Sequence, residues 1–257
     1  RPSLLGLKAL ECVVSTGTDY CDISFMAEDG RAHNDLAISA GAVAVIDCGV
    51  APGMSNMIAG HAAATMERCD DIVIAVGGLP RDPEPPFFYK AGFSPGDVLQ
   101  EYTRPARVVI DGETVTHKAL SDPVAIEFSG MPALEAFTTD GLRSLADTLD
   151  VPQMIEQTIR YPGHRDLMQT MRDMGLFSPE SIIVDGEPVI PLNVTSAVMF
   201  PLWTYQPGEE DLTVMRITAT GVDGGEAVTR VWELTDFYDP KPRHTSMSRV
   251  TAIPCTI

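Results

Sequence analysis

The sequence predicts an α+β fold: a mixed, largely antiparallel sheet with helices on one face, preceded by a remnant of a Rossmann-type parallel α/β sheet. Two observations lead to this prediction. The amino-terminal part alternates helical and strand patterns joined by short loops, which is typical of a parallel, doubly wound sheet. The rest of the chain mixes helices with strands that pair as hairpins around Asp-Gly turns, which is typical of an antiparallel sheet.

The amino-terminal alternation covers four elements. Apolar residues at helical spacing predict helices at 3–14 and 31–40. A short strand is expected at 19–23, and the continuous apolar run at 42–46 predicts a strand buried on both faces. These elements supply too few strands for a whole parallel domain. We therefore expect residues 1–52 to be the carboxy-terminal remnant of such a domain, in a fragment trimmed from a longer protein.

The later elements follow from the same patterns. Turn signals at Asp111-Gly112 and Asp223-Gly224 close two expected hairpins. Their strands are predicted at 106–110 with 113–118 and at 212–220 with 226–234. Further helices are predicted at 54–68, 141–149, 163–174, 193–203 and 246–253. Because strands rich in β-branched residues can continue a sheet across a two-fold axis, we expect the second hairpin to support a homodimer.

The charge balance excludes several classes of partner. The 257 residues include 36 acidic and 18 basic side chains, for a net charge of −18. Such a surface repels phosphate backbones and anionic lipids, so we expect neither nucleic acid nor a membrane as a partner. The absence of a long apolar run also argues against a transmembrane helix. These features predict a cytoplasmic protein.

The cysteines and histidines do not predict a metal site. The five cysteines are odd in number, lie far apart and form no Cys-x-x-Cys pair, and the five histidines never pair at helical spacing. We therefore predict no metal, and free thiols in place of disulfides.

A turn rich in glycine and proline follows the apolar run at 42–46 and opens a helix. Ligands of open α/β sheets bind outside the carboxyl ends of strands, where glycine lets the backbone approach closely and a helix start offers free N–H groups. Gly49, Pro52 and Gly53 are therefore candidates for contacting a cofactor. A tight strand-to-helix turn would need the same residues, and the sequence favours neither interpretation.

Basic residues near turns are candidates for binding an acidic substrate. Arg143 follows Asp140-Gly141, and Arg160 opens a short segment that ends at His164. Arginine offers a planar fork that matches a carboxylate, and histidine accepts protons near neutral pH. Salt bridges with the abundant acidic residues would explain these side chains equally well.

Six segments, taken in order, resemble the saccharopine dehydrogenase-like family. They are Gly17-x-Asp19-Tyr20-x-Asp22, Gly49-Val50-Ala51-Pro52-Gly53-Met54-Ser55-Asn56, Gly77-Gly78-Leu79-Pro80, Phe93-Ser94-Pro95, Asp140-Gly141-Leu142 and Arg160-Tyr161-Pro162-Gly163-His164. Each motif alone is weak, but their order and spacing are specific. Within the family the pattern is most similar to the lysine 6-dehydrogenase branch.

The resemblance implies a two-domain enzyme that uses NAD or NADP. A Rossmann domain would carry a glycine-rich phosphate-binding loop ahead of residue 1. Residues 53–240 would bind the substrate and form the dimer, and residues 241–257 would return toward the first domain. The implied reaction removes hydride from the amine-bearing carbon of lysine or a related amino acid, and this fragment alone is expected to be inactive.

Roles can be assigned to individual residues within the implied enzyme. The candidate catalytic residues are Asp22, Tyr161 and His164, and the candidate substrate-binding residues are Arg143, Arg160 and Ser94. We expect Arg143 to bind the substrate carboxylate, with Arg160 as its substitute. Asp22 would hold the substrate amine, Tyr161 or His164 would take part in proton movement, and the glycine-rich turn would shape the floor of the cleft.

Two alternatives stay open. Saccharopine-forming members of the family tend to carry an acid where this chain has Ala51. Losing that carboxylate argues weakly against a reductive coupling of the saccharopine or carboxynorspermidine type. The second alternative is a catalytically silent homologue that serves only in dimerisation.

Overall fold

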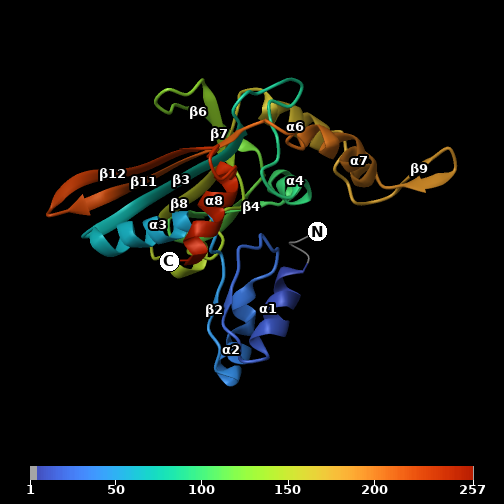
Figure 1. The fold of residues 1–257 in the computed structure, drawn as a ribbon. Helices are drawn as coiled ribbons and strands as arrows, with labels where there is room; N and C mark the ends of the chain where they lie inside the picture. The colour runs from blue at the N-terminus through green and yellow to red at the C-terminus, as the bar shows by residue number, and fades with distance from the viewer. Residues whose placement is uncertain (1–4, 257) are drawn as a thin grey trace.

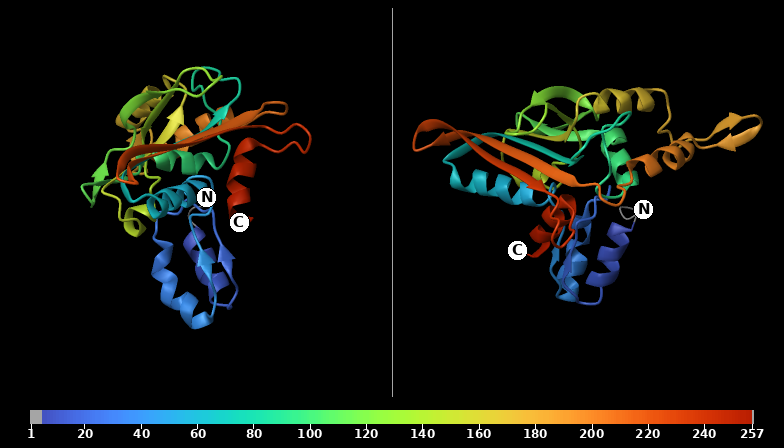
Figure 2. Two further views of the ribbon diagram at one scale, coloured as in Figure 1. Left: turned by 90° about the vertical axis from the view of Figure 1, so that its left-hand side faces the viewer. Right: turned by 45° about the horizontal axis from the view of Figure 1, so that its top comes forward.

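The structure, a computed structural model, describes residues 5–256 and confirms the predicted α+β architecture (Figure 1). A small amino-terminal unit stands below a large sheet. A long hairpin extends from one side of that sheet, and a helical arm extends from the other (Figures 1 and 2).

The amino-terminal unit contains a two-stranded parallel sheet with helices beside it. Its elements are α1 (Gly6–Val14), β1 (Tyr20–Cys21), the 3-10 helix η2 (Gly30–His33), α2 (Asn34–Ala40) and β2 (Ala44–Val45). Tyr20 lies opposite Ala44 in the parallel pair. The prediction that the strand at 42–46 is buried on both faces is wrong, because Val45 is 48% exposed. Among the described residues β2 pairs only with β1, which leaves part of its apolar run uncovered.

The large sheet is mixed but mostly antiparallel. Its main path runs in the order β12-β11-β3-β8-β4-β5, and β7 pairs with both β8 and β6. Only β3 and β8 pair in parallel within it. The strands are β3 (Arg68–Pro80), β4 (Ala106–Ile110), β5 (Glu113–His117), β6 (Ser121–Ile126), β7 (Leu134–Thr138), β8 (Gln153–Arg160), β11 (Asp211–Asp223) and β12 (Glu226–Phe237). Both predicted hairpins are confirmed, as β4 with β5 and β11 with β12.

Side chains of the central strands point alternately to the two faces of the sheet, and a hydrophobic core covers each face. On one face, Ile72 and Ile74 of β3 belong to a core that includes Ala59 and Ala62 of α3 (Met54–Thr65). The helices α5 (Leu145–Thr148) and α8 (Ser246–Ala252) contribute to the same core. On the other face, Leu79 packs in a second core that β7 helps to form. Helices therefore gather on one face, as the sequence predicts.

The helical arm has an aromatic core of its own. It contains α4 (Pro95–Thr103), α6 (His164–Asp173), α7 (Pro191–Trp203) and the short hairpin of β9 (Ile182–Val184) and β10 (Glu187–Val189). Tyr102 and Trp203 are fully buried in this core. The expected helix at 141–149 shrinks to α5, because residues before it form a turn in which Arg143 has a φ of +52°. The last described element is a 3-10 helix, η3 (Ile253–Thr256).

Within the described residues, no helix combines the length and the apolar character needed to cross a membrane.

Candidate active site

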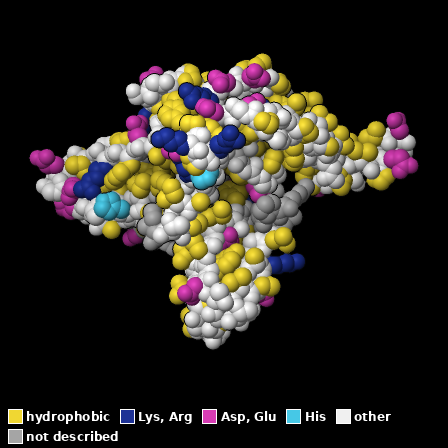
Figure 3. All heavy atoms as spheres, viewed as in Figure 1, with side chains coloured by type: hydrophobic (Ala, Val, Ile, Leu, Met, Phe, Trp, Pro, Cys, Tyr) yellow, Lys and Arg dark blue, Asp and Glu magenta, His cyan; other side chains and the backbone are white. Residues whose placement is uncertain are grey.

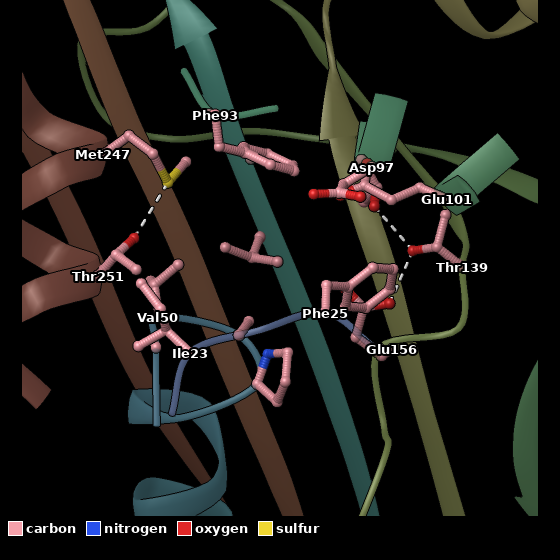
Figure 4. A pocket seen from close by; sticks show the side chains of 18 of the residues that line it. Ile23, Phe25, Val50, Phe93, Asp97, Glu101, Thr139, Glu156, Met247 and Thr251 are labelled. Carbon is pink, nitrogen blue, oxygen red and sulfur yellow. Dashed lines mark hydrogen bonds between the residues drawn. The ribbon is translucent and has the colours of Figure 1, made fainter. Parts of the chain in front are cut away.

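A cavity of about 320 Å³ lies where the amino-terminal unit meets the large sheet. Its lining comes from the loop after β1, the loop before α3, the strands β3 and β8, and the helices α4 and α8. The wall has two chemically different halves (Figure 4). Ile23, Val50 and Met247 lie on an apolar side, and Asp97 and Glu156 lie on an acidic side.

Within residues 5–256, the acidic half contains four carboxyl side chains and one guanidinium. The carboxyl groups belong to Asp97, Glu101, Asp140 and Glu156, and the guanidinium belongs to Arg160. β8 supplies Glu156, Thr158 and Arg160 at alternate positions, so all three side chains share the face that lines the cavity. Asp97 and Glu101 are four residues apart on α4 and therefore share one face of that helix.

Glu156 is a buried carboxyl group that is held in place from both sides. The Thr139 hydroxyl donates a hydrogen bond of 2.7 Å to its Oε2 atom. A Cβ atom at Gly141 would lie 2.2 Å from its Cδ atom, so any larger residue there would displace the carboxyl group. Burial raises the pKa of Glu156 to about 8, although the bond from Thr139 opposes the rise. A carboxyl group with this pKa can both take up and release a proton near neutral pH.

Arg160 is the positively charged group of the cavity wall. Its Nη2 atom pairs with Glu101 Oε2 at 2.9 Å, its Nη1 atom donates to the Ile159 carbonyl at 2.9 Å, and its Nε atom donates to the Tyr102 hydroxyl at 3.0 Å. The guanidinium also lies over the Tyr89 ring, 4.5 Å from its centroid. A guanidinium has five N–H donors, and these contacts with described residues use three of them. One N–H on each terminal nitrogen therefore has no acceptor among the described residues.

His164 lies behind Arg160 and fixes its position. The ring Nδ1 atom is 2.7 Å from the Phe87 carbonyl, which can only accept, so Nδ1 carries the proton. The Nε2 atom then accepts from the Tyr102 hydroxyl at 2.9 Å, and that oxygen accepts from Arg160. Burial, together with the charge of Arg160, lowers the pKa of His164 to about 3. The ring is therefore neutral at physiological pH.

Tyr161 and His164, which the sequence suggests for proton movement, are not part of the cavity wall. Tyr161 directs its hydroxyl to the Pro80 carbonyl, at 2.9 Å, because successive residues of an extended strand face opposite sides. His164 is fully buried in the aromatic core of the helical arm.

Arg143, the expected carboxylate ligand, also lies outside this wall. Its guanidinium is 3.7 Å from Asp140 and 3.9 Å from Asp47, and its Nη2 atom donates to the Met26 carbonyl. It lines a smaller, separate hollow beside the amino-terminal unit. The structure therefore places Arg160 in the main cavity and Arg143 behind it, where it supports Asp140.

The other predicted site residues are divided between the wall and its supports. Ser94, Gly49 and Pro52 line the cavity. Gly53 serves the turn, because its φ is +141° and a Cβ atom there would lie 1.9 Å from the Gly49 carbonyl oxygen. Asp22 is buried outside the wall, and its Oδ1 atom accepts from the backbone N–H of Ser24 at 2.8 Å.

Glu156, Glu101 and Asp97 are wall residues that sequence reasoning missed. Spacing was the available signal: the charged residues Glu156 and Arg160 occupy alternate positions of one strand, and two acids lie one helical turn apart on α4. Polar residues on one face of an otherwise buried strand are typical of a site.

Known structures with similar folds include a dehydrogenase. The apo form of saccharopine dehydrogenase (L-Glu forming) from Saccharomyces cerevisiae matches 100% of this chain and 74% of its own, with a TM-score of 0.72 and 18% sequence identity. At this identity the likeness shows the fold alone. A structure of yvaA from Bacillus subtilis matches 91% of this chain and 64% of its own at 10% identity, but its TM-score of 0.26 supports no conclusion.

The sequence profile of the saccharopine dehydrogenase C-terminal domain matches residues 49–257. The match includes β3, β8, α4 and α8, which supply both halves of the cavity wall. The chain therefore belongs to the saccharopine dehydrogenase C-terminal domain family.

Proposed function

We propose that this chain supplies the substrate pocket of an NAD(P)-dependent oxidoreductase that oxidises the amine-bearing carbon of lysine or a related amino acid. One observation carries the proposal: among the described residues, a single guanidinium, on Arg160, faces a cavity that four carboxyl groups also line. Lysine has one carboxylate and two amines, which matches this distribution of charge. The family supports the class of reaction, since it is named for a dehydrogenase.

The apolar half of the cavity fits a nicotinamide ring. It includes Ile23, Val50, Ala51 and Pro52, which follow the carboxyl ends of the parallel strands β1 and β2. This is where open α/β sheets bind their ligands. Gly49 and Pro52 would contact the ring, and a bound nicotinamide supplies the acceptor for hydride. The sequence contains no Gly-x-Gly-x-x-Gly loop, so we assign only the site of the ring.

Glu156 would accept the proton that the substrate ammonium must lose before its carbon can release hydride. Its pKa of about 8 is close to neutral pH, where proton exchange is most efficient. At pH 7 this pKa keeps most of the Glu156 carboxyl groups protonated, and a bound ammonium would shift them toward the carboxylate form that accepts the proton. Arg160 would orient the substrate through its carboxylate, and Phe25, Phe93 and Met247 would exclude water from the reacting carbon.

Ala51 supports a small amine over saccharopine as the substrate. It lines the cavity, so the position where saccharopine-forming relatives tend to carry an acid faces the substrate here. Without that carboxylate, the described residues of the apolar half offer no acidic partner to a second polar arm of the substrate.

A substrate panel tests the proposed reaction. The full-length gene product should oxidise L-lysine or a close homologue with NAD⁺ or NADP⁺, and its kcat/KM should exceed that for saccharopine by about tenfold or more, because binding polar groups without partners is costly. Assays run in both directions, with carboxynorspermidine included, separate amine oxidation from reductive coupling. A preference for saccharopine or carboxynorspermidine would select the coupling reaction, and no turnover of any amine would favour a silent homologue.

We also propose that the protein is a homodimer that pairs through β12. This strand is an edge of the large sheet, with a partner on one side only among the described residues. Exposed side chains alternate along it, and Val231 at its middle is 52% exposed. Hydrophobic side chains also gather on the side of the sheet that carries the long hairpin (Figure 3). A second copy of β12 would satisfy the open edge.

Light scattering at micromolar concentration should give about twice the chain mass of 27.7 kDa. Val231→Lys should raise the dissociation constant by roughly tenfold or more, since like charges then face each other across the two-fold axis. Ile183→Lys on β9 changes an exposed side chain of the helical arm in the same way and should leave the dimer intact. A monomeric wild type, or dissociation caused by Ile183→Lys alone, would contradict pairing through β12.

A further inference from the structure

Three cysteines that are distant in the sequence meet in the structure. Cys21 ends β1, Cys48 lies in the loop after β2, and Cys255 lies in η3. Their Sγ atoms are all within 4.8 Å of one another. Cys48 and Cys255 are separated by 207 residues, which is why no spacing in the sequence predicts the cluster.

The cluster joins the amino-terminal unit to the carboxy-terminal helix at the cavity. Cys48 directly precedes Gly49, and Cys255 follows Thr251 by one helical turn. Gly49 and Thr251 both line the cavity. A link between Cys48 and Cys255 would therefore connect two parts of the apolar wall.

All three cysteines are free thiols, and each one faces the backbone carbonyl of another segment. The Cys255 thiol donates to the Cys48 carbonyl at 3.0 Å. The contacts of Cys48 with the Pro254 carbonyl, at 3.7 Å, and of Cys21 with the Cys255 carbonyl, at 3.9 Å, are longer. An S–H group is a weak hydrogen-bond donor, so little is lost when these hydrogen bonds are replaced by bonds from the sulfur atoms to a metal ion. Cys21 is exposed, which gives an ion access to the buried Cys48.

We propose that Cys21, Cys48 and Cys255 bind one thiophilic cation of the Zn²⁺ type, independently of the proposed dehydrogenase activity. Tetrahedral zinc with Zn–S bonds of about 2.3 Å separates its sulfur ligands by about 3.8 Å, a spacing compatible with the 4.8 Å limit of this cluster. Three thiolates fill three positions of the tetrahedron. A disulfide would use only two of the three thiols, whereas a cation engages them all.

A water molecule would complete the site, because the cluster of the described residues holds three sulfur atoms and no carboxylate oxygen or imidazole nitrogen. Asp22 follows Cys21 but lies outside the cluster, and its Oδ1 atom accepts hydrogen bonds from the backbone N–H and the hydroxyl of Ser24.

Metal titration tests the site. The reduced, chelator-treated protein is titrated with Zn²⁺ against a chromophoric competitor, and with Co²⁺ as a spectroscopic probe. We expect one equivalent of each ion to bind, a thiolate-to-cobalt charge-transfer band to appear, and Zn²⁺ to raise the melting temperature. Cys21→Ser should weaken binding by at least about 100-fold, because loss of a direct ligand costs more than the 10–100-fold typical of a supporting residue.

Cys21 is exposed, so its replacement leaves the core intact, and Cys48→Ser gives a second, buried test. Cys12→Ser is the matched control, because Cys12 is an exposed thiol of α1 outside the cluster; it should bind both ions like the wild type. Binding of less than one equivalent, a missing charge-transfer band, or unchanged affinity in Cys21→Ser would overturn the proposal. The proposal would also be overturned if two of the cysteines form a disulfide in air and the protein, after reduction, still does not bind Zn²⁺.

Discussion

Glu156→Gln is expected to lower kcat/KM for amine oxidation by about 10²–10⁴-fold in the full-length enzyme, the usual contribution of a positioned acid–base group. Glutamine keeps the shape of the side chain and can still accept the hydrogen bond from Thr139, but it cannot take up a proton. Wild-type kcat/KM should rise with pH and level off near the pKa of Glu156, at about 8. Steady-state kinetics across pH 6–9 should show that this rise is lost in the variant.

Glu135→Gln provides the control for this substitution. Glu135 is a half-buried carboxyl group of β7 whose pKa burial also raises, but it does not line the cavity. Its replacement should leave kcat/KM within about threefold of the wild type. Equal losses of kcat/KM in the two variants, or an unchanged rise of kcat/KM with pH in Glu156→Gln, would show that Glu156 is not the proton acceptor.

The same substitution should change how stability depends on pH. The folded-state pKa of Glu156, about 8, lies above the ordinary value of 4.5, so the folded protein holds this proton while the unfolded chain has lost it. The contribution of Glu156 to the free energy of unfolding is therefore full below about pH 4.5 and is lost as the pH rises toward 8. Denaturant titrations at pH 5 and pH 8 should show a smaller decrease in Glu156→Gln than in the wild type.

Arg160→Met is expected to weaken L-lysine binding by roughly 10–160-fold, which corresponds to about 1.5–3 kcal/mol for hydrogen bonds to a charged group. Methionine fills much of the same space but offers no donor to a carboxylate. The substitution also leaves Glu101 without its ion-pair partner. Burial already raises the pKa of Glu101, so this carboxyl group can take up a proton instead of staying charged. Isothermal titration calorimetry measures the loss.

Arg143→Lys tests whether Arg143 or Arg160 binds the substrate carboxylate. Lysine keeps a positive charge beside Asp47 and Asp140 but loses the planar fork that grips a carboxylate. Because Arg143 lies outside the main cavity, affinity for L-lysine should stay within about threefold of the wild type. A larger loss of affinity than in Arg160→Met would show that Arg143, and not Arg160, binds the substrate carboxylate.

Regular local patterns made most of the fold predictable. The helix near 163–174 follows from its apolar spacing, and both hairpins follow from Asp-Gly turns, which fix the register of the strands beside them. β8 was not predicted. Its polar residues face a buried cavity, so the strand lacks the simple alternation of apolar and polar residues that marks a half-exposed strand.

The site was less predictable, because its contacts are long-range. Arg143 and Arg160 both follow or precede turns and look equivalent in the sequence. Only the folded chain shows that Arg160 faces the cavity while Arg143 pairs with acids behind it. Glu156 is one of many acidic residues in the sequence. Its burial distinguishes it from most of them, and that burial depends on β3, β7 and α4 around its strand.

Titration of the wild type and Arg160→Met with two ligands tests the central claim most directly. The ligands are L-lysine and 1,5-diaminopentane, which is lysine without its carboxylate. If Arg160 binds the carboxylate, the substitution should weaken L-lysine by about tenfold or more and the diamine by less than about threefold. Equal losses for the two ligands would show that Arg160 only maintains the fold, and would contradict the proposed pocket.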